Sequence, residues 1–397
     1  MRVTRRRLLA VAASGTGAIA AGGTAAASTR SRTAREPFHG AHQAGVTTPM
    51  QSHLHFTSFD VTAIGAAALR DLLRAWTDAA ARMCAGHPLG PVGGDPQAPP
   101  ADTGEAYGLG PARLTLTFGF GPSLFDGRFG LAGQRPAALA DLPAFATDHL
   151  DPARCGGDLG VQACADDPLV AFHALRSLAR IGEGAARARW SQAGFDRTPG
   201  NAPAGATGRN LMGFKDGTNN LDASDAAAMR RNVWVPRADG PAWMAGGTYL
   251  VTRRIGIRIE RWDASDLDEQ ETDVGRTKVV GAPLGERREF DPADPAKLPP
   301  DCHILLANPR RPASEAERIL RRGYSYSDGL GSGGRLDAGL FFAAFQRDPR
   351  RQFVTIQRRL AAHDLLNEYL VHTGSALFAV PPGVREGGFV GESLLGR

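Results

Sequence analysis

The 397-residue sequence has little of several features that would each point to a particular class of protein. After its N-terminal segment it has no uninterrupted apolar run near the ~18 residues that a membrane-spanning helix needs. Its four cysteines are too few for a dense disulfide framework, and it shows no repeat of short period. These absences argue against a membrane-spanning, disulfide-rich or repeat protein. With 42% hydrophobic residues, the sequence predicts a soluble chain with a substantial core.

The N-terminal segment has the layout of an export signal. The pair Arg5 and Arg6 is followed by apolar residues, by a weakly hydrophobic Ala- and Gly-rich stretch to Ala21, and by small residues at 25–27 that suit a cleavage site. Paired arginines and weak hydrophobicity indicate the twin-arginine (Tat) translocase. A disordered basic tail would explain the charge but not this order of parts. We therefore expect residues 1–27 to be a Tat signal peptide, and the mature protein to be periplasmic or extracellular.

The basic character of the chain comes largely from that segment. The formal net charge is +5, and residues 1–27 hold four arginines and no acidic residue, which leaves +1 for the rest. The sequence pI of about 9.3 is therefore mostly a property of the signal peptide. For this reason no nucleic-acid partner is predicted.

Two of the cysteines, Cys155 and Cys164, are near enough in sequence to be considered as a pair. They could form a disulfide in an oxidising compartment. We favour two buried free thiols, because a Tat substrate folds in the reducing cytosol before export. Cys84 lies within a helical pattern and is expected to be a small core residue.

About 370 residues remain after the signal, enough for one large domain or two of ordinary size. They divide into an N-terminal extension at 28–52 and two halves at 53–225 and 226–397. In the first half, strands are expected at 53–59, 113–120 and 159–165, and helices at 69–83 and 167–190. In the second, strands are expected at 249–259, 304–306, 339–345 and 376–380, and helices within 314–321 and 353–371. The repeated order predicts a duplicated α+β fold with helices on one side of each sheet.

Two groups of residues are weak candidates for metal binding. One is the acidic stretch at 266–273, for which we favour a solvated loop. The other is His53 and His55, which lie two apart and therefore on one face of the first strand.

Two stretches carry residues suited to chemistry, although each also has an ordinary explanation. Residues 213–220 read GFKDGTNN and place Asp216 between glycines, where the backbone can turn sharply and direct the carboxylate into a cavity. An Asp-Gly turn is the ordinary explanation. Residues 321–326 read RRGYSY and close the helical pattern that begins near Ser314. Basic residues commonly lie at the C-terminus of a helix.

A third stretch, 302–310, reads CHILLANPR and places His303 at the start of an apolar strand. A single histidine in such a place is usually a core residue. Its neighbour Cys302 would point to the opposite face of a strand, so the two residues would chelate zinc poorly. A single axial histidine suits haem, because the porphyrin supplies the other four ligands.

Together, in their order and spacing along the chain, the three stretches resemble the dye-decolorising peroxidases. In that family the stretch at 213–220 is the GxxDG signature. The segments at 45–48, 275–278 and 336–342 resemble the same family. The similarity extends from about Pro37 to Leu395. It is nearest to the Tat-exported branch, which includes the deferrochelatase/peroxidases.

The resemblance implies two ferredoxin-like halves with antiparallel sheets, of the dimeric α+β barrel type. It also implies one haem b per chain, held mainly by the second half. His303 would be the proximal ligand of the haem iron, and Asp216 and Arg321 would be the catalytic residues on the distal face. If His303 is not the ligand, His173 and His363 are the next candidates.

Further residues would surround the haem. Those expected at its edge are Gly217, Thr218, Asn219, Asn308, Pro309 and Arg310. Arg310 or Arg276 could pair with a propionate, because a guanidinium group matches a carboxylate in a two-pronged contact. We assign Asp364 as the acid that accepts the N–H of the proximal imidazole, with Glu368, one turn on, as its competitor. Leu305 stands where a polar or basic residue is expected, which would alter hydrogen bonding at the haem edge.

The implied activity is the reduction of hydrogen peroxide with oxidation of dyes or phenolic reductants. Asp216 would move the proton, and Arg321 would stabilise charge as the O–O bond polarises. Electrons from bulky dyes could pass through Tyr324, Tyr326 or Trp262, although for each of these we favour a packing role. The alternatives are a deferrochelatase, which releases iron from haem and leaves the porphyrin intact, and a non-enzymatic exported haem-binding protein. The sequence leaves open the reductant and whether the chain forms a homo-oligomer.

Export should depend on the paired arginines. Replacing both Arg5 and Arg6 by lysine keeps the charge but removes the guanidinium groups that the Tat translocase reads. We therefore expect the mature protein to disappear from the periplasm or medium and its precursor to accumulate in the cytoplasm, as measured by immunodetection after cell fractionation. Secretion of the double-lysine variant at the wild-type level would instead favour the Sec pathway.

Overall fold

The computed structural model describes residues 34–197, 201, 203 and 205–396. The expected signal peptide at 1–27 lies outside the described residues. Among the helices that the structure describes, none is long and apolar enough to span a membrane.

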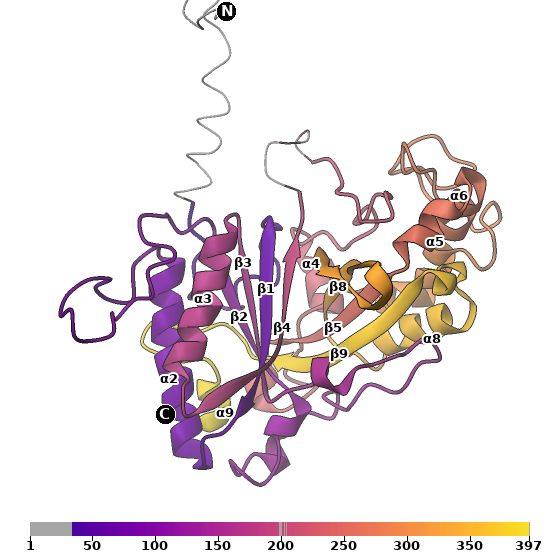
Figure 1. Ribbon diagram of the computed structural model, residues 1–397. Coiled ribbons are helices and arrows are strands. Elements are labelled where there is room, and N and C mark those ends of the chain that lie inside the picture. Colours follow the sequence, from indigo (N-terminus) through magenta and orange to yellow (C-terminus); the bar gives the residue numbers. More distant parts are fainter. Residues whose placement is uncertain (1–33, 198–200, 202, 204, 397) are drawn as a thin grey trace, which may run out of the picture.

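Strands from both halves of the chain close into one antiparallel barrel (Figure 1). The first half contributes β1 (His53–Val61), β2 (Thr115–Phe120), β3 (Leu159–Ala165) and β4 (Ala186–Phe195). The second half contributes β5 (Thr248–Ile257), β6 (Leu320–Arg321), β7 (Tyr324–Leu330), β8 (Leu336–Gln346) and β9 (Leu370–Val380). The strand order is β5-β9-β2-β3-β1-β4-β7-β8, and β8 pairs with β5 to close the sheet. The two-residue strand β6 pairs with β8 at its edge.

Apart from the two-residue strand β6, and with α5 to α7 taken as one helical region, each half follows the order strand, helix, two strands, helix, strand, which confirms the predicted duplicated α+β fold. In the first half the helices are α2 (Gly65–Cys84) and α3 (Pro168–Ile181). In the second half, α5 (Ile259–Ala264), α6 (Leu267–Val274) and α7 (His303–Ala307) precede β7, and α8 (Phe353–His363) precedes β9. The halves meet edge to edge through two short pairings, Phe120 with Ala379 and Phe195 with Ser325.

Shorter helices complete the structure. They are α4 (Ala226–Asn232) and α9 (Glu392–Leu395), and the 3₁₀ turns Pro122–Leu124, Ala132–Gln134, Pro152–Arg154, Ala242–Met244, Pro312–Ala316, Ser332–Gly334 and Leu365–Glu368.

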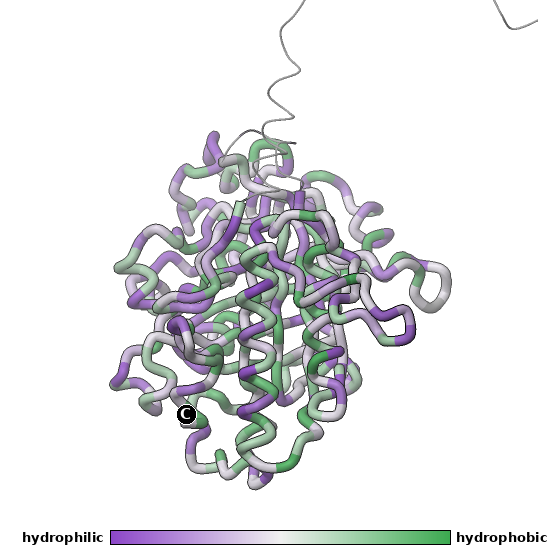
Figure 2. The backbone as a smooth tube through the Cα atoms, turned by 90° about the vertical axis from the view of Figure 1, so that its left-hand side faces the viewer, coloured by the Kyte–Doolittle hydropathy of each residue, from purple (hydrophilic) through white to green (hydrophobic). Residues whose placement is uncertain are grey.

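Side-chain alternation along the strands separates two apolar layers. Inside the barrel, Phe56 of β1 contacts Phe341 of β8 and Phe378 of β9, at ring-centroid distances of 5.5 and 5.7 Å. Outside, α2 and α3 cover the sheet of the first half, and Trp76 of α2 donates its indole N–H to the carbonyl of Leu178 in α3 at 2.8 Å. In Figure 2 the helices facing the viewer carry both hydrophilic and hydrophobic residues, as amphipathic helices on a sheet do.

The first-half prediction of a helix at 167–190 is wrong beyond Ile181. α3 ends there, and after a turn β4 begins at Ala186. Gly184 in this turn has φ +83°, a left-handed conformation that favours glycine and stops a helix. The residues that follow pair with β1, and buried and exposed residues alternate over 192–195, so the segment is a strand.

The prediction of a solvated loop at 266–273 is also wrong. This acidic stretch forms α6, and Asp266 caps the helix by accepting the backbone N–H of Glu269 at 2.9 Å. Acidic residues near the N-terminus of a helix stabilise it, because they interact favourably with the helix dipole. Thus the charges that suggested a solvated loop favour the first turn of a helix.

All four cysteines are free thiols in the structure. Cys84, Cys164 and Cys302 are buried, whereas Cys155 is only half-buried. Burial raises the pKa of the Cys84 thiol to about 12, as expected for a small core residue. Cys155 and Cys164 therefore do not pair here.

Candidate functional site

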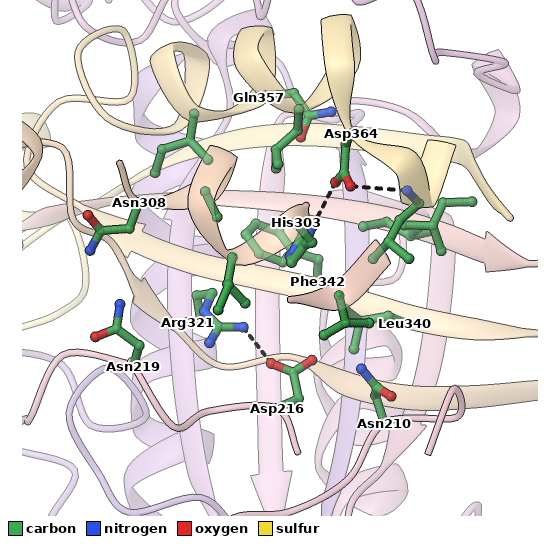
Figure 3. A pocket seen from close by; sticks show the side chains of 18 of the residues that line it. Asn210, Asp216, Asn219, His303, Asn308, Arg321, Leu340, Phe342, Gln357 and Asp364 are labelled. Carbon is green, nitrogen blue, oxygen red and sulfur yellow. Dashed lines mark hydrogen bonds and ion pairs between the residues drawn. The ribbon is translucent and has the colours of Figure 1, made fainter. Parts of the chain in front are cut away.

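A cavity of about 250 Å³ lies between the outer face of the second-half sheet and α7 and α8. Its floor is apolar because alternate residues of β8 face outward, while Phe341 between them faces the barrel interior. The apolar residues that line the cavity include Ile255, Ile257, Leu340, Phe342, Ile356, Leu360 and Leu370. Figure 3 shows the polar side chains that face the same space.

His303 is the first residue of α7, so the prediction that it opens a strand at 304–306 is wrong. The apolar run is short, and such a run can form either a helix or a buried strand. The helical choice depends on tertiary contacts, because Arg359 of α8 donates to the carbonyl of Leu306 near the end of α7 at 2.9 Å. The argument that Cys302 points to the opposite strand face therefore no longer applies. Cys302 is nevertheless fully buried, and it is not among the residues that line the cavity.

Asp364 anchors the imidazole of His303. His303 Nδ1 lies 2.7 Å from Asp364 Oδ2, and Asp364 Oδ1 accepts the backbone N–H of Leu366 at 3.0 Å. The Asp364 side chain is only 3% exposed, whereas His303 is 35% exposed because it faces the cavity. The bond to Nδ1 leaves Nε2 available to a group in the cavity. Glu368 instead pairs with Arg261 at the surface.

The charges around His303 raise the pKa of its imidazole. Burial lowers the pKa of His303, but the charge and hydrogen bond of Asp364 and the charge of Asp216 raise it, with a net increase. A partner that accepts from Nδ1 also makes an imidazole a stronger ligand through its other nitrogen.

Asp216 and Arg321 form an ion pair on the other side of the cavity. Arg321 Nη1 donates to Asp216 Oδ1 at 2.5 Å, and Figure 3 shows His303 between this pair and Asp364. Burial raises the pKa of Asp216, but the charge and hydrogen bond of Arg321, with smaller effects of His303 and Asn210, bring it below its usual value. Asp216 is therefore a carboxylate over a wide range of pH.

The prediction that Arg321 ends a helix is wrong. The helical pattern from 314 gives only the 3₁₀ turn Pro312–Ala316, and Arg321 lies in strand β6, where it pairs with Ala344 of β8. Pairing with β8 fixes the backbone of Arg321 beside the barrel, and its side chain extends from there to the cavity.

The loop that carries Asp216 is a small hairpin held at several points. Arg209 and Lys215 form an antiparallel bridge, and the N–H of Asp216 donates to the carbonyl of Gly208 at 2.9 Å. Gly213 and Gly217 have φ of +83° and +129°, so the motif needs glycine at both positions.

Sequence reasoning missed two residues that hold this loop in place. Glu289, whose side chain is 10% exposed, accepts hydrogen bonds from Lys215 and from Thr218. Asn210 accepts the backbone N–H groups of Met212 and Phe214. Their only sequence signal is that carboxylates and amides are suited to binding backbone or hydroxyl donors, which does not reveal their partners.

The edge of the cavity carries an excess of positive charge. Arg276, Arg310 and Arg318 all line it. The pKa of Arg310 is lowered by burial and by the charge of Arg318, and that of Arg276 by burial and by the charge of Arg310. Arg310 has φ +59°, and its Nε is buried without a partner among the described residues. This edge therefore suits an anionic group, although Arg276 already donates to the carbonyls of Gly281 and Glu289.

Most residues that the sequence assigned to the haem lie together around this cavity. The lining includes Asp216, Gly217, Thr218, Asn219, Arg276, His303, Asn308, Arg310, Arg321 and Asp364. Pro309 is not among the lining residues. His363 and His173 are not among them either; His363 is exposed at the end of α8, and His173 contacts Glu105 at 3.0 Å. His55 contacts Ser191 at 2.9 Å.

The residues present fit haem. The cavity has an apolar floor, an imidazole with a free nitrogen on one side, an acid–arginine pair on the other, and cationic side chains at one edge. A flat, apolar macrocycle with two carboxylates and an axially open iron matches these features. The partnerless Nε of Arg310 is a donor that a carboxylate at that edge could satisfy.

Two family models match the chain: "Dyp-type peroxidase, N-terminal" at residues 43–196 and "Dyp-type peroxidase, C-terminal" at residues 207–385. The chain belongs to the Dyp-type peroxidase family. It is therefore a haem peroxidase, and its α+β barrel is the fold of that family.

Relatives of this peroxidase include the deferrochelatase of Escherichia coli strain K12, which is 41% identical over 374 residues, covering 92% of this chain and 88% of that protein. Ferric DtpA from Streptomyces lividans is 43% identical with a TM-score of 0.85, covering 92% of this chain and 98% of that one. The DyP-type peroxidase from Cellulomonas bogoriensis is 40% identical with a TM-score of 0.83, covering 92% and 99%.

Replacing His303 with alanine should abolish or severely reduce haem incorporation, because the imidazole nitrogen that would hold the iron is removed while the cavity remains. His363→Ala is the matched control, because His363 is exposed at the end of α8 and does not line the cavity. The measurement is haem content per chain from the pyridine haemochromogen and the Soret band. Full haem content in His303→Ala would show that another residue binds the iron.

Proposed function

We propose that this peroxidase reduces hydrogen peroxide at haem b and oxidises dyes or phenolic reductants, with His303 as the residue that would hold the iron and Asp216 and Arg321 as catalytic residues. The observation that carries the proposal is the Asp216–Arg321 pair, which faces the same cavity as the Asp364-anchored imidazole of His303. Simple storage of haem would not need a paired acid and cation at this place.

The second half of the chain would hold the cofactor. His303 would bind the iron through Nε2, and Arg310 or Arg276 would pair with a propionate. Asn219 and Asn308 would contact the edge of the macrocycle. When bound, haem supplies a redox-active iron that accepts oxidising equivalents from peroxide and passes them to the reductant.

Asp216 and Arg321 would share the work of breaking the O–O bond. The carboxylate of Asp216 accepts a proton from one oxygen of hydrogen peroxide and returns it to the departing oxygen, which leaves as water. The guanidinium of Arg321 stabilises the negative charge that develops on the peroxide as the bond breaks. Because Arg321 also keeps Asp216 ionised, the base is ready when peroxide arrives.

The second candidate function is that of a deferrochelatase. Its support is that relatives 41% identical to this chain are named deferrochelatases. In that case the same cavity would bind haem as substrate, and the iron would leave while the porphyrin stayed intact. We also propose export by the Tat translocase, on the strength of Arg5, Arg6 and the order of the parts in residues 1–27.

One experiment separates these functions. The purified holoprotein is mixed with one equivalent of hydrogen peroxide and then with an anthraquinone dye, and its spectrum is followed. A peroxidase should show a rapid change of the Soret band that the dye reverses with loss of its colour. Release of iron with the appearance of free protoporphyrin fluorescence would favour the deferrochelatase. If the spectrum does not respond to peroxide, haem binding without catalysis is the only one of these functions that remains.

Substitutions of the catalytic pair should have different pH dependences. Asp216→Asn removes the base, so above the pKa of Asp216 the rate of reaction with peroxide should fall ~100- to 10,000-fold relative to wild type. In the wild type, the rate should fall only as the pH drops below the lowered pKa of Asp216, because protonation removes the base. Arg321→Leu should lose rate and also shift this fall to higher pH, because burial then raises the pKa of Asp216 without an opposing cation.

The measurement is the stopped-flow rate across a pH series, with haem content as a control for folding. If Asp216→Asn reacts as fast as wild type while Arg321→Leu fails, the arginine is the essential group and Asp216 only shapes the cavity.

A further inference from the structure

The side chain of Asn220 joins the loop of Asp216 to the strand of Arg321. Its Nδ2 donates to the carbonyl of Arg321 at 2.7 Å, and its Oδ1 accepts the N–H of Arg321 at 2.9 Å. The carboxamide therefore pairs with both backbone groups of one residue, as a neighbouring strand would.

Strand β6 needs such a partner because it is only two residues long. On one side, Leu320 and Arg321 pair with Phe345 and Ala344 of β8. On the other side, where a longer sheet would continue, Asn220 satisfies the backbone of Arg321. Two-sided pairing restricts the backbone from which the Arg321 side chain extends.

Asn220 is itself well anchored within the loop. Its N–H donates to the carbonyl of Gly217 at 2.9 Å, and its Oδ1 also accepts the N–H of Leu221 at 3.0 Å. Arg318 donates to its carbonyl at 3.3 Å. The residue thus connects the turn that follows Asp216 rigidly to the backbone of Arg321.

We propose that Asn220 is a positioning residue, whose carboxamide holds the backbone of Arg321 so that the guanidinium stays against Asp216. The inference rests on the proposed function of that pair. Asn220 touches neither the peroxide nor the cofactor in this role, and acts only through Arg321.

The carboxamide of Asn220 carries a separate donor and acceptor, which match the carbonyl and the N–H of Arg321. Asn220→Asp keeps the shape, but it loses the donor and places a carboxylate oxygen against the carbonyl of Arg321. Asn220→Ala loses both hydrogen bonds. Because either change removes a hydrogen bond that holds the backbone of Arg321, it should release Arg321 enough to slow the reaction with peroxide about tenfold.

The test uses the haem-loaded enzyme in four forms: wild type, Asn220→Ala, Asn220→Asp and Arg321→Leu. Two properties are measured. The first is the stopped-flow rate with peroxide across a pH series. The second is the dissociation constant of fluoride for the ferric enzyme, which requires no turnover. Asp222→Ala is the matched control, because Asp222 lies on the same segment, is exposed and bonds to Ser224.

Both Asn220 variants should react about tenfold more slowly. The fall in rate at acidic pH should move toward that of Arg321→Leu, because a displaced guanidinium no longer lowers the pKa of Asp216. Fluoride should bind more weakly, because the affinity for an anion depends on the position of the guanidinium of Arg321 beside it. Asp222→Ala should match wild type. A residue that merely stabilised the fold would change thermal stability without moving the pH profile.

A double variant, Asn220→Ala with Arg321→Leu, shows whether the effect passes through the arginine. We expect no further loss beyond Arg321→Leu alone, because residues that act as a unit are not additive. An equal loss in both backgrounds, or wild-type rate, pH profile and fluoride affinity in a folded Asn220→Asp, overturns the proposal. If Arg321→Leu is itself fully active, the proposed function fails instead, and fluoride binding still reports whether Asn220 positions Arg321.

Discussion

Closure of the barrel through the pairing of β5 with β8 is the constraint on which the rest of the structure depends. Once the sheet closes, each strand has an inner and an outer face, and successive side chains alternate between them. Phe341 then packs against Phe56 inside, while Leu340 and Phe342 form the outer floor of the cavity. The same alternation that builds the core therefore also builds an apolar wall for the cofactor.

Upon this wall the charged groups are arranged so that each carboxylate has a partner. Asp364 holds the imidazole of His303, and Asp216 is paired with Arg321. Arg310, by contrast, is left with a buried Nε that has no partner in the described part of the chain. Burying a charge is costly unless it is paired, so an anionic group at this edge would stabilise the loaded protein more than the empty one.

The proposed catalytic pair, Asp216 and Arg321, is assembled from segments that are far apart in the chain, and short-range contacts hold them together. Asp216 depends on its hairpin and on Glu289, which holds Lys215 and Thr218 on either side of it. Arg321 depends on β8 and on Asn220. These polar contacts keep a carboxylate beside a guanidinium, which is the arrangement that the proposed catalysis by charge stabilisation requires.

The sequence alone determined the elements whose signal is local: the alternating strands, the helix at 69–83, the duplicated order, and motifs that include Asp216, His303 and Arg321. It could not decide residues 303–307, because a short apolar run has no clear period and the contact with Arg359 selects the helix. It favoured Asp364 over Glu368 but could not decide between them. That choice depends on where α8 ends, because the ending turns Asp364 toward His303 and leaves Glu368 at the surface with Arg261. Partnerships between distant segments depend on the tertiary structure, since no local pattern records them.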